Sequence, residues 1–221
     1  FIFDDILDQS KMNAEKMEIY NEPYSLPAVI DELKVLFFHM VSDKGLSLEV
    51  TLPEELNDML IIGDSLRLKQ VLTNLISNAI KFTHEGFVSL YVKFEKLSDS
   101  LNLTFIISDT GIGISKEQQS TVFDQFSRQS ITTSARYKGS GLGLSIAKGL
   151  IENMGGKISL KSELEIGSTF IIKLNVPFLE IDKNISTGID QKPLGKSKIM
   201  IVEDDGWNAL LLKEVIEPLV G

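Results

Sequence analysis

The segment TNLISNAIKFT carries two amides and an amine at regular spacing. Asn74, Asn78 and Lys81 are separated by four and three residues, so on a helix they lie along one face. An Asn carbonyl oxygen is a hard ligand that suits Mg²⁺, and an ammonium group suits a phosphate. On the helix alone, a solvated polar stripe is the more common explanation. The segment therefore indicates a metal and phosphate site only if other segments supply the remaining contacts.

The segment LNLTFIISDTGIG places a carboxylate at the end of an alternating apolar strand. Every second residue from Leu101 onward is apolar until Asp109, so the core-facing side of this strand ends in an acid. A partly buried carboxylate needs hydrogen-bond donors, and the exocyclic amine of adenine is a suitable one. Gly111 and Gly113 would let a flat ring lie close to the backbone. The alternative is an Asp that caps its own turn, which is common in Asp-Thr-Gly segments.

Two further segments carry glycines and aromatic residues that suit a lid over a ligand. In KGSGLGLSIAKGL, Gly139, Gly141 and Gly143 precede a helix whose first backbone N–H groups are free to bind an anion. Their spacing matches neither the phosphate loop G-x-x-x-x-G-K-[ST] nor the dinucleotide pattern G-x-G-x-x-G, and a flexible hinge is the alternative. In VFDQF, Phe123 and Phe126 are three residues apart, which suits either a lid anchor or two core aromatics.

Composition excludes several classes of function. The chain has 221 residues, of which 43% are hydrophobic and 24% charged, as in an ordinary globular protein. The net charge of −9 argues against DNA or RNA as a partner, although a few local donors still allow a bound phosphate. The lack of cysteine rules out disulfides and thiolate metal sites, and it fits a cytoplasmic location without establishing one. No apolar stretch approaches the roughly 20 residues that a membrane-spanning helix needs.

The elements that must position these segments are a mixture of helices and strands. The apolar periodicity predicts helices over residues 26–42, 64–82, 116–126 and 141–154, and strands over residues 46–53, 59–62, 88–97, 101–109, 157–163 and 168–176. The polar residues 127–138 are expected to form a loop. This mixture predicts an α/β two-layer sandwich, with several helices on one face of a mixed sheet.

The two ends of the chain differ from this central domain. Residues 1–20 place apolar side chains at helical spacing among acids and amides, which predicts an amphipathic helix that pairs with another helix and is broken by Pro23. Residues 181–196 are polar and contain Gly and Pro, as linkers do. Residues 197–221 contain the apolar run KIMIV but are too short to build a core, so we expect them to be part of a further domain.

Together and in this order, the four motif segments resemble the GHKL ATPase fold shared by histidine kinases, DNA gyrase, MutL and the heat-shock-90 chaperones. NLISNAIKF, DTGIG, FDQF and GSGLGLSIAK are each similar to the histidine-kinase version, and GSTF near residue 170 fits the last glycine motif of the family. The similarity covers about residues 24–178. The implied organisation is that of a hybrid sensor kinase: the second helix of the dimerisation and histidine-phosphotransfer hairpin at 1–22, the catalytic ATP-binding domain at 23–180, a linker at 181–196 and the start of a receiver domain at 197–221.

The resemblance implies a role for each motif residue. Asn78 would hold Mg²⁺, Asn74 would support the metal or the phosphates, and Lys81 would contact a phosphate of ATP. Asp109 would recognise the adenine amine, with Thr169 nearby through water.

The glycines and aromatics complete the ATP-binding set that the resemblance implies. Gly111 and Gly113 would shape the base pocket. Lid closure would involve Phe123, Phe126, Gly139, Gly141 and Gly143. Arg128 is a weaker phosphate candidate, for which a surface role is at least as good an explanation.

The activity that the resemblance implies is that of a protein histidine kinase, which transfers the γ-phosphoryl group of ATP to a histidine. The chain has two histidines, His39 and His84, and neither lies in a sequence like S-H-E-L-R-T-P of the phosphoacceptor helix. For His39 we expect a half-buried position on a helix. We expect the acceptor helix to precede Phe1 and this chain to be unable to phosphorylate itself.

The expected partners follow from the same resemblance: the phosphoacceptor histidine helix, a receiver domain or response regulator, and a second copy of the chain through residues 1–20. Glu203 and Asp204 match the Mg²⁺-binding acids of a receiver, but the strand with the phosphoacceptor Asp is absent, so a solvated turn is preferred for them. The expected location is cytoplasmic, whether or not the parent protein has a membrane anchor.

Two alternatives stay open: an ATP-binding regulatory module without transfer, and an ATP-hydrolysing switch. The latter ranks last because Asn74, an amide, occupies the position of the acid that activates water.

Overall fold

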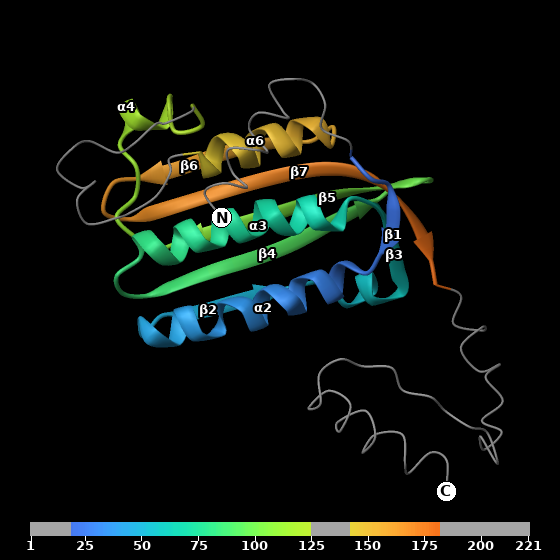
Figure 1. Ribbon diagram of the computed structural model, residues 1–221, viewed down its shortest axis with the longest axis horizontal. Helices are drawn as coiled ribbons and strands as arrows, with labels where there is room; N and C mark the ends of the chain where they lie inside the picture. Colours follow the sequence, from blue (N-terminus) through green and yellow to red (C-terminus); the bar gives the residue numbers. More distant parts are fainter. Residues whose placement is uncertain (1–18, 125–141, 182–221) are drawn as a thin grey trace, which may run out of the picture. The chain divides into compact units, whose positions relative to one another are not determined.

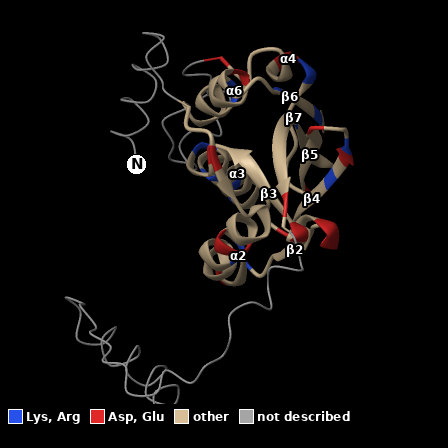
Figure 2. Ribbon diagram, turned by 90° about the vertical axis from the view of Figure 1, so that its right-hand side faces the viewer, with Lys and Arg blue, Asp and Glu red and all other residues tan. Residues whose placement is uncertain are grey.

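A mixed sheet is covered on one face by helices, as Figures 1 and 2 show. The computed structural model describes residues 19–124 and 142–181. The strands in this part of the chain are β1 (Glu22–Tyr24), β2 (Ser47–Thr51), β3 (Met59–Gly63), β4 (Phe87–Lys96), β5 (Ser100–Asp109), β6 (Lys157–Glu163) and β7 (Gly167–Glu180). The helices are α2 (Leu26–Asp43), the 3-10 helix η1 (Glu54–Asp58), α3 (Ser65–Phe82), α4 (Lys116–Gln119) and α6 (Gly143–Asn153). The α/β two-layer sandwich is confirmed, with α2, α3 and α6 side by side on one face.

The long strand β7 organises the sheet. The strand order is β1-β3-β7-β5-β4-β2, and β6 also pairs with β7. Of these pairs β2 and β4 run parallel, and the others are antiparallel. The register of β5 and β7 places Asp109 opposite Ser168, so the acid at the end of β5 lies beside the start of β7.

The core lies between the middle strands of the sheet and the layer formed by α3 and its neighbouring helices. The apolar stripe predicted on α3 is buried throughout: Leu68, Val71, Leu72, Leu75, Ile76, Ala79 and Ile80. On β5 the alternate residues Leu101, Leu103, Phe105 and Ile107 are buried in the same core. The N-terminus of α3 is capped by Asp64, whose side chain accepts a hydrogen bond from the Arg67 N–H at 2.9 Å. The helix that carries the two amides is thus fixed at its start and along its length.

The helix expected over residues 116–126 was wrong in length, because α4 ends at Gln119. After it the backbone makes tighter turns, with the Thr121 N–H bonded to the Gln118 carbonyl at 3.1 Å. The Ser120 hydroxyl also donates to the Glu117 carbonyl, at 2.7 Å. Side-chain hydroxyls that bond nearby carbonyls compete with a regular helix, so a run of Ser and Thr ends it.

Two further expectations about the N-terminal part were incomplete or wrong. The strand β1 was not predicted. It contains Pro23, which lacks a backbone N–H, but β1 is an edge strand and needs fewer backbone donors. His39 was expected to be half-buried but is exposed on the outer face of α2, where its ring meets Phe38 edge-on at 5.4 Å. Within the described ranges, the helices are too short or too polar to cross a bilayer.

Candidate functional site

The two predicted amides of α3 form a hydrogen-bonded pair that reaches the start of α6. The Asn78 side-chain N–H donates to the Asn74 carbonyl oxygen at 3.2 Å. The Asn74 side-chain N–H in turn donates to the backbone carbonyl of Gly143, the first residue of α6. Asn78 therefore keeps its own carbonyl oxygen, which has no hydrogen bond among the described residues. An amide oxygen held in this way suits a hard cation.

Gly143 is needed because α6 approaches Asn74 closely. A methyl group at Gly143 would lie 2.4 Å from the Asn74 carbonyl oxygen. Such a contact is far below any normal separation, so the side chain of Asn74 would have to move. The last glycine of the GSGLG segment thus shapes the amide pair directly.

Asp109 is half-buried at the end of β5 and has two backbone donors. One of its carboxylate oxygens accepts from the Gly111 N–H at 2.9 Å and from the Ser168 N–H at 3.3 Å. Burial raises the pKa of Asp109, and the two N–H groups offset this in part. The second carboxylate oxygen has no hydrogen bond within the described part of the chain. It is available to a donor such as an aromatic amine.

The loop after Asp109 is joined to the end of α3. The Ile112 N–H donates to the Phe82 carbonyl at 3.2 Å. A side chain at Gly111 would collide with that carbonyl, at 2.4 Å, and one at Gly113 would lie 2.0 Å from the Glu163 carbonyl. Gly113 also has a φ of 65°, a conformation that favours glycine. Both glycines are therefore required by the packing of the loop, before any ligand is considered.

Thr169 does not share a face with Asp109. The register pairs Asp109 with Ser168 and Ser108 with Thr169, and the hydroxyls of the latter two are 3.0 Å apart. Because neighbouring residues on a strand point to opposite faces, Thr169 lies on the sheet face away from the carboxylate. The buried Ser168, which the sequence reasoning missed, takes the place beside Asp109. Alternation along GSTFIIKL was the signal that could have found it, since Phe170 is a buried residue of the same face as Ser168.

Lys81 and Phe123 lie in partly apolar settings. Burial lowers the pKa of Lys81, whose ammonium nitrogen is 4.9 Å from the centre of the Phe82 ring. Phe123 packs edge-on against Phe170, with ring centres 6.2 Å apart, and the Lys148 ammonium lies 5.9 Å from its ring. Phe123 therefore anchors its segment on the sheet. This fits both explanations offered for VFDQF: an anchor for a lid, and an aromatic residue of the core.

Several predicted site residues lie outside the described residues. These are Phe126, Arg128, Gly139, Gly141, Glu203 and Asp204. The amphipathic segment 1–18 and the segments 182–196 and 197–221 lie outside them as well. Their expected roles stay predictions.

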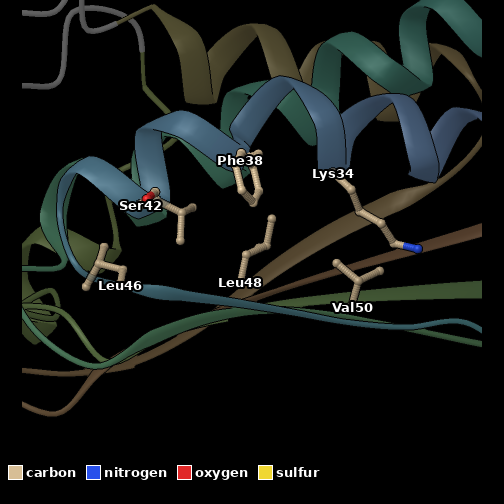
Figure 3. Close-up of a pocket in the computed structure, with 7 residues that line it drawn as sticks. Lys34, Phe38, Ser42, Leu46, Leu48 and Val50 are labelled. Atoms are coloured by element: carbon tan, nitrogen blue, oxygen red, sulfur yellow. The ribbon is translucent and has the colours of Figure 1, made fainter.

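A separate groove lies between α2 and the edge strand β2, away from the motif residues. It has a volume of about 570 Å³ and is lined by Lys34, Phe38, Val41, Ser42, Leu46, Leu48 and Val50. Figure 3 shows Phe38 and Leu48 pointing toward each other across it. None of its lining residues belongs to the four motif segments, so this groove is distinct from the candidate site.

Comparison with known families matches residues 63–177 to the histidine kinase-, DNA gyrase B-, and HSP90-like ATPases. The signal transduction histidine-protein kinase BarA of Escherichia coli (strain K12) is 40% identical over 185 residues, which cover 83% of this chain and 20% of BarA. The aerobic respiration control sensor protein ArcB of the same strain is 34% identical over 221 residues, covering 99% of this chain and 28% of ArcB. The chain thus spans between a fifth and a third of the length of these relatives.

Solved structures show the same fold. The catalytic domain of the histidine kinase ThkA, in a nucleotide-free form, has a TM-score of 0.53 and 28% identity, covering 72% of this chain and 98% of that one. Full-length ShkA in complex with AMPPNP has a TM-score of 0.66 and 24% identity, covering 97% of this chain and 42% of that one.

Proposed function

The chain belongs to the histidine kinase-, DNA gyrase B-, and HSP90-like ATPase family, and from this premise we propose that it binds Mg-ATP and transfers the γ-phosphoryl group to a histidine of an acceptor helix. Its similarity to BarA and ArcB identifies it with the catalytic domains of sensor histidine kinases. The observation that carries the proposal is the bond between the Ile112 N–H and the Phe82 carbonyl. It joins the helix with the amides to the loop that follows Asp109.

The base end of the site is built around Asp109. In the proposal, its second carboxylate oxygen accepts a hydrogen bond from the adenine amine, while the Gly111 and Ser168 N–H groups hold the first oxygen in place. A donor at the second oxygen stabilises the ionised acid that burial disfavours. Ser168, rather than Thr169, lines this end.

The phosphate end is built around the amide pair. The free carbonyl oxygen of Asn78 fits Mg²⁺, since amide oxygens are among the ligands this ion accepts. Bound Mg²⁺ would neutralise charge on the phosphate oxygens. Asn74 holds Asn78 in orientation through their hydrogen bond. In the proposal, the ammonium of Lys81 contacts a phosphate.

Catalysis in this proposal depends on position and charge. The chain orients the phosphate for attack by an imidazole that comes from an acceptor helix, and it supplies donors where negative charge accumulates. We propose that Phe123 anchors the segment of Phe126, Gly139 and Gly141 as a lid over the nucleotide.

A hydrolytic switch is disfavoured by a contact of Asn74. Water activation needs a base that takes a proton, and an amide does not. The Asn74 side chain also donates its N–H to the Gly143 carbonyl, which fixes it as a structural bridge. The regulatory module without transfer remains the second candidate.

The organisation around this domain is part of the proposal. We propose that residues 1–22 belong to a dimerisation helix through which two copies associate, that 181–196 is a linker, and that 197–221 opens a receiver domain, with a solvated turn preferred for Glu203 and Asp204. The two relatives carry the words kinase and sensor in their names, which supports a signalling role. A receiver domain or response regulator as partner is part of the same proposal. A cytoplasmic location is part of the same proposal.

Calorimetric titration with Mg-ATP tests the site. Asn78→Ala and Asp109→Ala are each expected to abolish measurable binding, because each removes the main contact at one end. Asn175→Ala is the matched control, since this Asn bonds Ser100 and Asn102 on the sheet and is expected to leave affinity unchanged. Unchanged affinity in both site variants would contradict the proposal.

A transfer assay separates the two candidate functions. The chain is mixed with a separately produced phosphoacceptor hairpin and γ-labelled ATP. Label on the histidine supports the kinase, whereas tight ATP binding with an unlabelled hairpin supports the regulatory module.

A further inference from the structure

The last turn of α3 is where the phosphate end and the base end of the proposed site meet, so its backbone hydrogen bonds decide how firmly they are joined. A helix leaves its last four carbonyls without partners inside the helix. In α3 the first of them, on Ala79, accepts from the Thr83 N–H at 3.0 Å and from its hydroxyl at 2.7 Å. The last, on Phe82, accepts from the Ile112 N–H.

The two remaining carbonyls, on Ile80 and Lys81, and that of the capping residue Thr83 all bond to one cation, Lys44. Its ammonium nitrogen lies 2.7 Å from the Ile80 oxygen, 3.0 Å from the Lys81 oxygen and 3.2 Å from the Thr83 oxygen. An ammonium has three N–H groups, and here each finds a carbonyl. Its charge also sits at the negative end of the helix dipole.

This contact differs from an ordinary surface ion pair. Lys44 comes from the turn between α2 and β2 and reaches the end of α3 across more than 35 residues of sequence. Lys69 also ties α3 to α2, by an ion pair with Glu32, but both side chains of that pair are exposed and such pairs contribute little. Lys44 replaces the missing backbone partners of a helix end, which the ion pair does not.

We infer that Lys44 is a positioning residue for the phosphate end of the nucleotide site, an inference that rests on the proposed function. It holds the turn that carries Lys81 and follows Asn78. Without Lys44, the carbonyls of Ile80 and Lys81 lose their donor and the turn is free to rotate toward water. The side chain of Lys81 and the carbonyl that Phe82 presents to Ile112 then lose their fixed places.

The test compares Lys44→Met with Lys69→Met by calorimetry, using Mg-ATP and adenosine. Methionine keeps the length and apolar stem of lysine but has no donor. Lys44→Met is expected to weaken Mg-ATP binding by about tenfold, as the loss of an outer-shell partner does. The same variant is expected to weaken adenosine binding much less, because adenosine has no phosphate to contact the phosphate end of the proposed site. Lys69→Met is expected to leave both affinities unchanged.

A second measurement uses the nucleotide-free protein. Hydrogen exchange at the Ile112 amide, whose acceptor is the Phe82 carbonyl, is expected to be faster in Lys44→Met than in Lys69→Met. A second pair of variants covers the case in which Lys44→Met does not fold. Lys44→Arg keeps the charge and the N–H donors, whereas Lys44→Gln keeps a donor but no charge. The loss of Mg-ATP affinity is expected to be smaller in Lys44→Arg than in Lys44→Gln.

Three results would overturn the inference. One is an unchanged Mg-ATP affinity in Lys44→Met, and another is an equal loss for adenosine and Mg-ATP, which would indicate a general loss of the fold. The third is wild-type protein that does not bind Mg-ATP, which would overturn the proposed function together with this role. The first two leave the proposed function intact, so the failures are distinguishable.

Discussion

Asp109 shows how the surroundings of one side chain act on its charge in opposite directions. Half-burial disfavours its charge, while the N–H groups of Gly111 and Ser168 favour it. The position of the acid on the core-facing side was predicted from strand alternation, because every second residue before it is apolar. Its role toward adenine was implied by the family resemblance. Its partner Ser168 was missed, although alternation along GSTFIIKL indicates the buried face. That Ser168 lies opposite Asp109 depends on the register between β7 and β5, which is a property of the folded sheet.

Asp109→Asn is expected to stabilise the nucleotide-free protein at neutral pH. The pKa of Asp109 is raised in the folded state, so its ionisation costs folding free energy. Below the ordinary carboxyl pKa of about 3.9 the acid is neutral in both states and this cost vanishes. Asparagine has no charge and keeps an oxygen that accepts from the Gly111 N–H.

Denaturant unfolding of both proteins between pH 4 and 7 measures this difference. The stability advantage of Asp109→Asn is expected to be largest at pH 7 and to shrink as the pH falls through the raised pKa. An advantage that grows toward low pH would contradict the account of Asp109.

Hydrogen bonds join three elements that carry residues of the proposed site: α3, α6 and the loop after β5. The helices and most strands were predicted from periodicity, because α3 and β5 each bury one regular face. The early end of α4 escaped prediction because hydroxyl groups compete with its backbone bonds. The role of Lys44 also escaped it, since nothing local in VSDKGL indicates that its side chain reaches the end of another helix.

Gly143→Ala tests the contact between α6 and α3. The added methyl group would lie 2.4 Å from the Asn74 carbonyl oxygen, and the flexible end of that side chain would move away. Alanine favours a helix over glycine by about 1 kcal/mol, so the melting temperature is expected to stay equal or rise. Mg-ATP affinity is expected to fall by about tenfold, as when a supporting partner is lost.

A double-mutant cycle with Asn74→Ala is the control. If Gly143 acts through Asn74, adding Gly143→Ala to Asn74→Ala causes no further loss of affinity. Fully additive losses would show that Gly143 acts by another route.

At the scale of the whole molecule, the described part of the chain has helices α2, α3 and α6 on one face of the sheet (Figure 1). Asn74 of α3 bonds to Gly143 at the start of α6, and Asp109 at the end of β5 lies opposite Ser168 at the start of β7. The groove between α2 and β2 involves other residues (Figure 3). The fold class could be predicted because local patterns and global packing agree. We propose that Asn78 and Asp109 belong to one site, and contacts between segments far apart in the sequence support this.

The central claim, one site with a base end and a phosphate end, is tested most directly by nuclear magnetic resonance of the labelled protein. Adenosine alone is expected to shift the backbone amide signals of Gly111 and Ser168. The shift of the Thr169 amide signal is expected to be smaller. Mg-ATP is expected to shift the side-chain amide signals of Asn74 and Asn78 in addition. If neither ligand moves these signals, or if the shifts gather at Phe38 and Leu48 of the groove, the claim is contradicted.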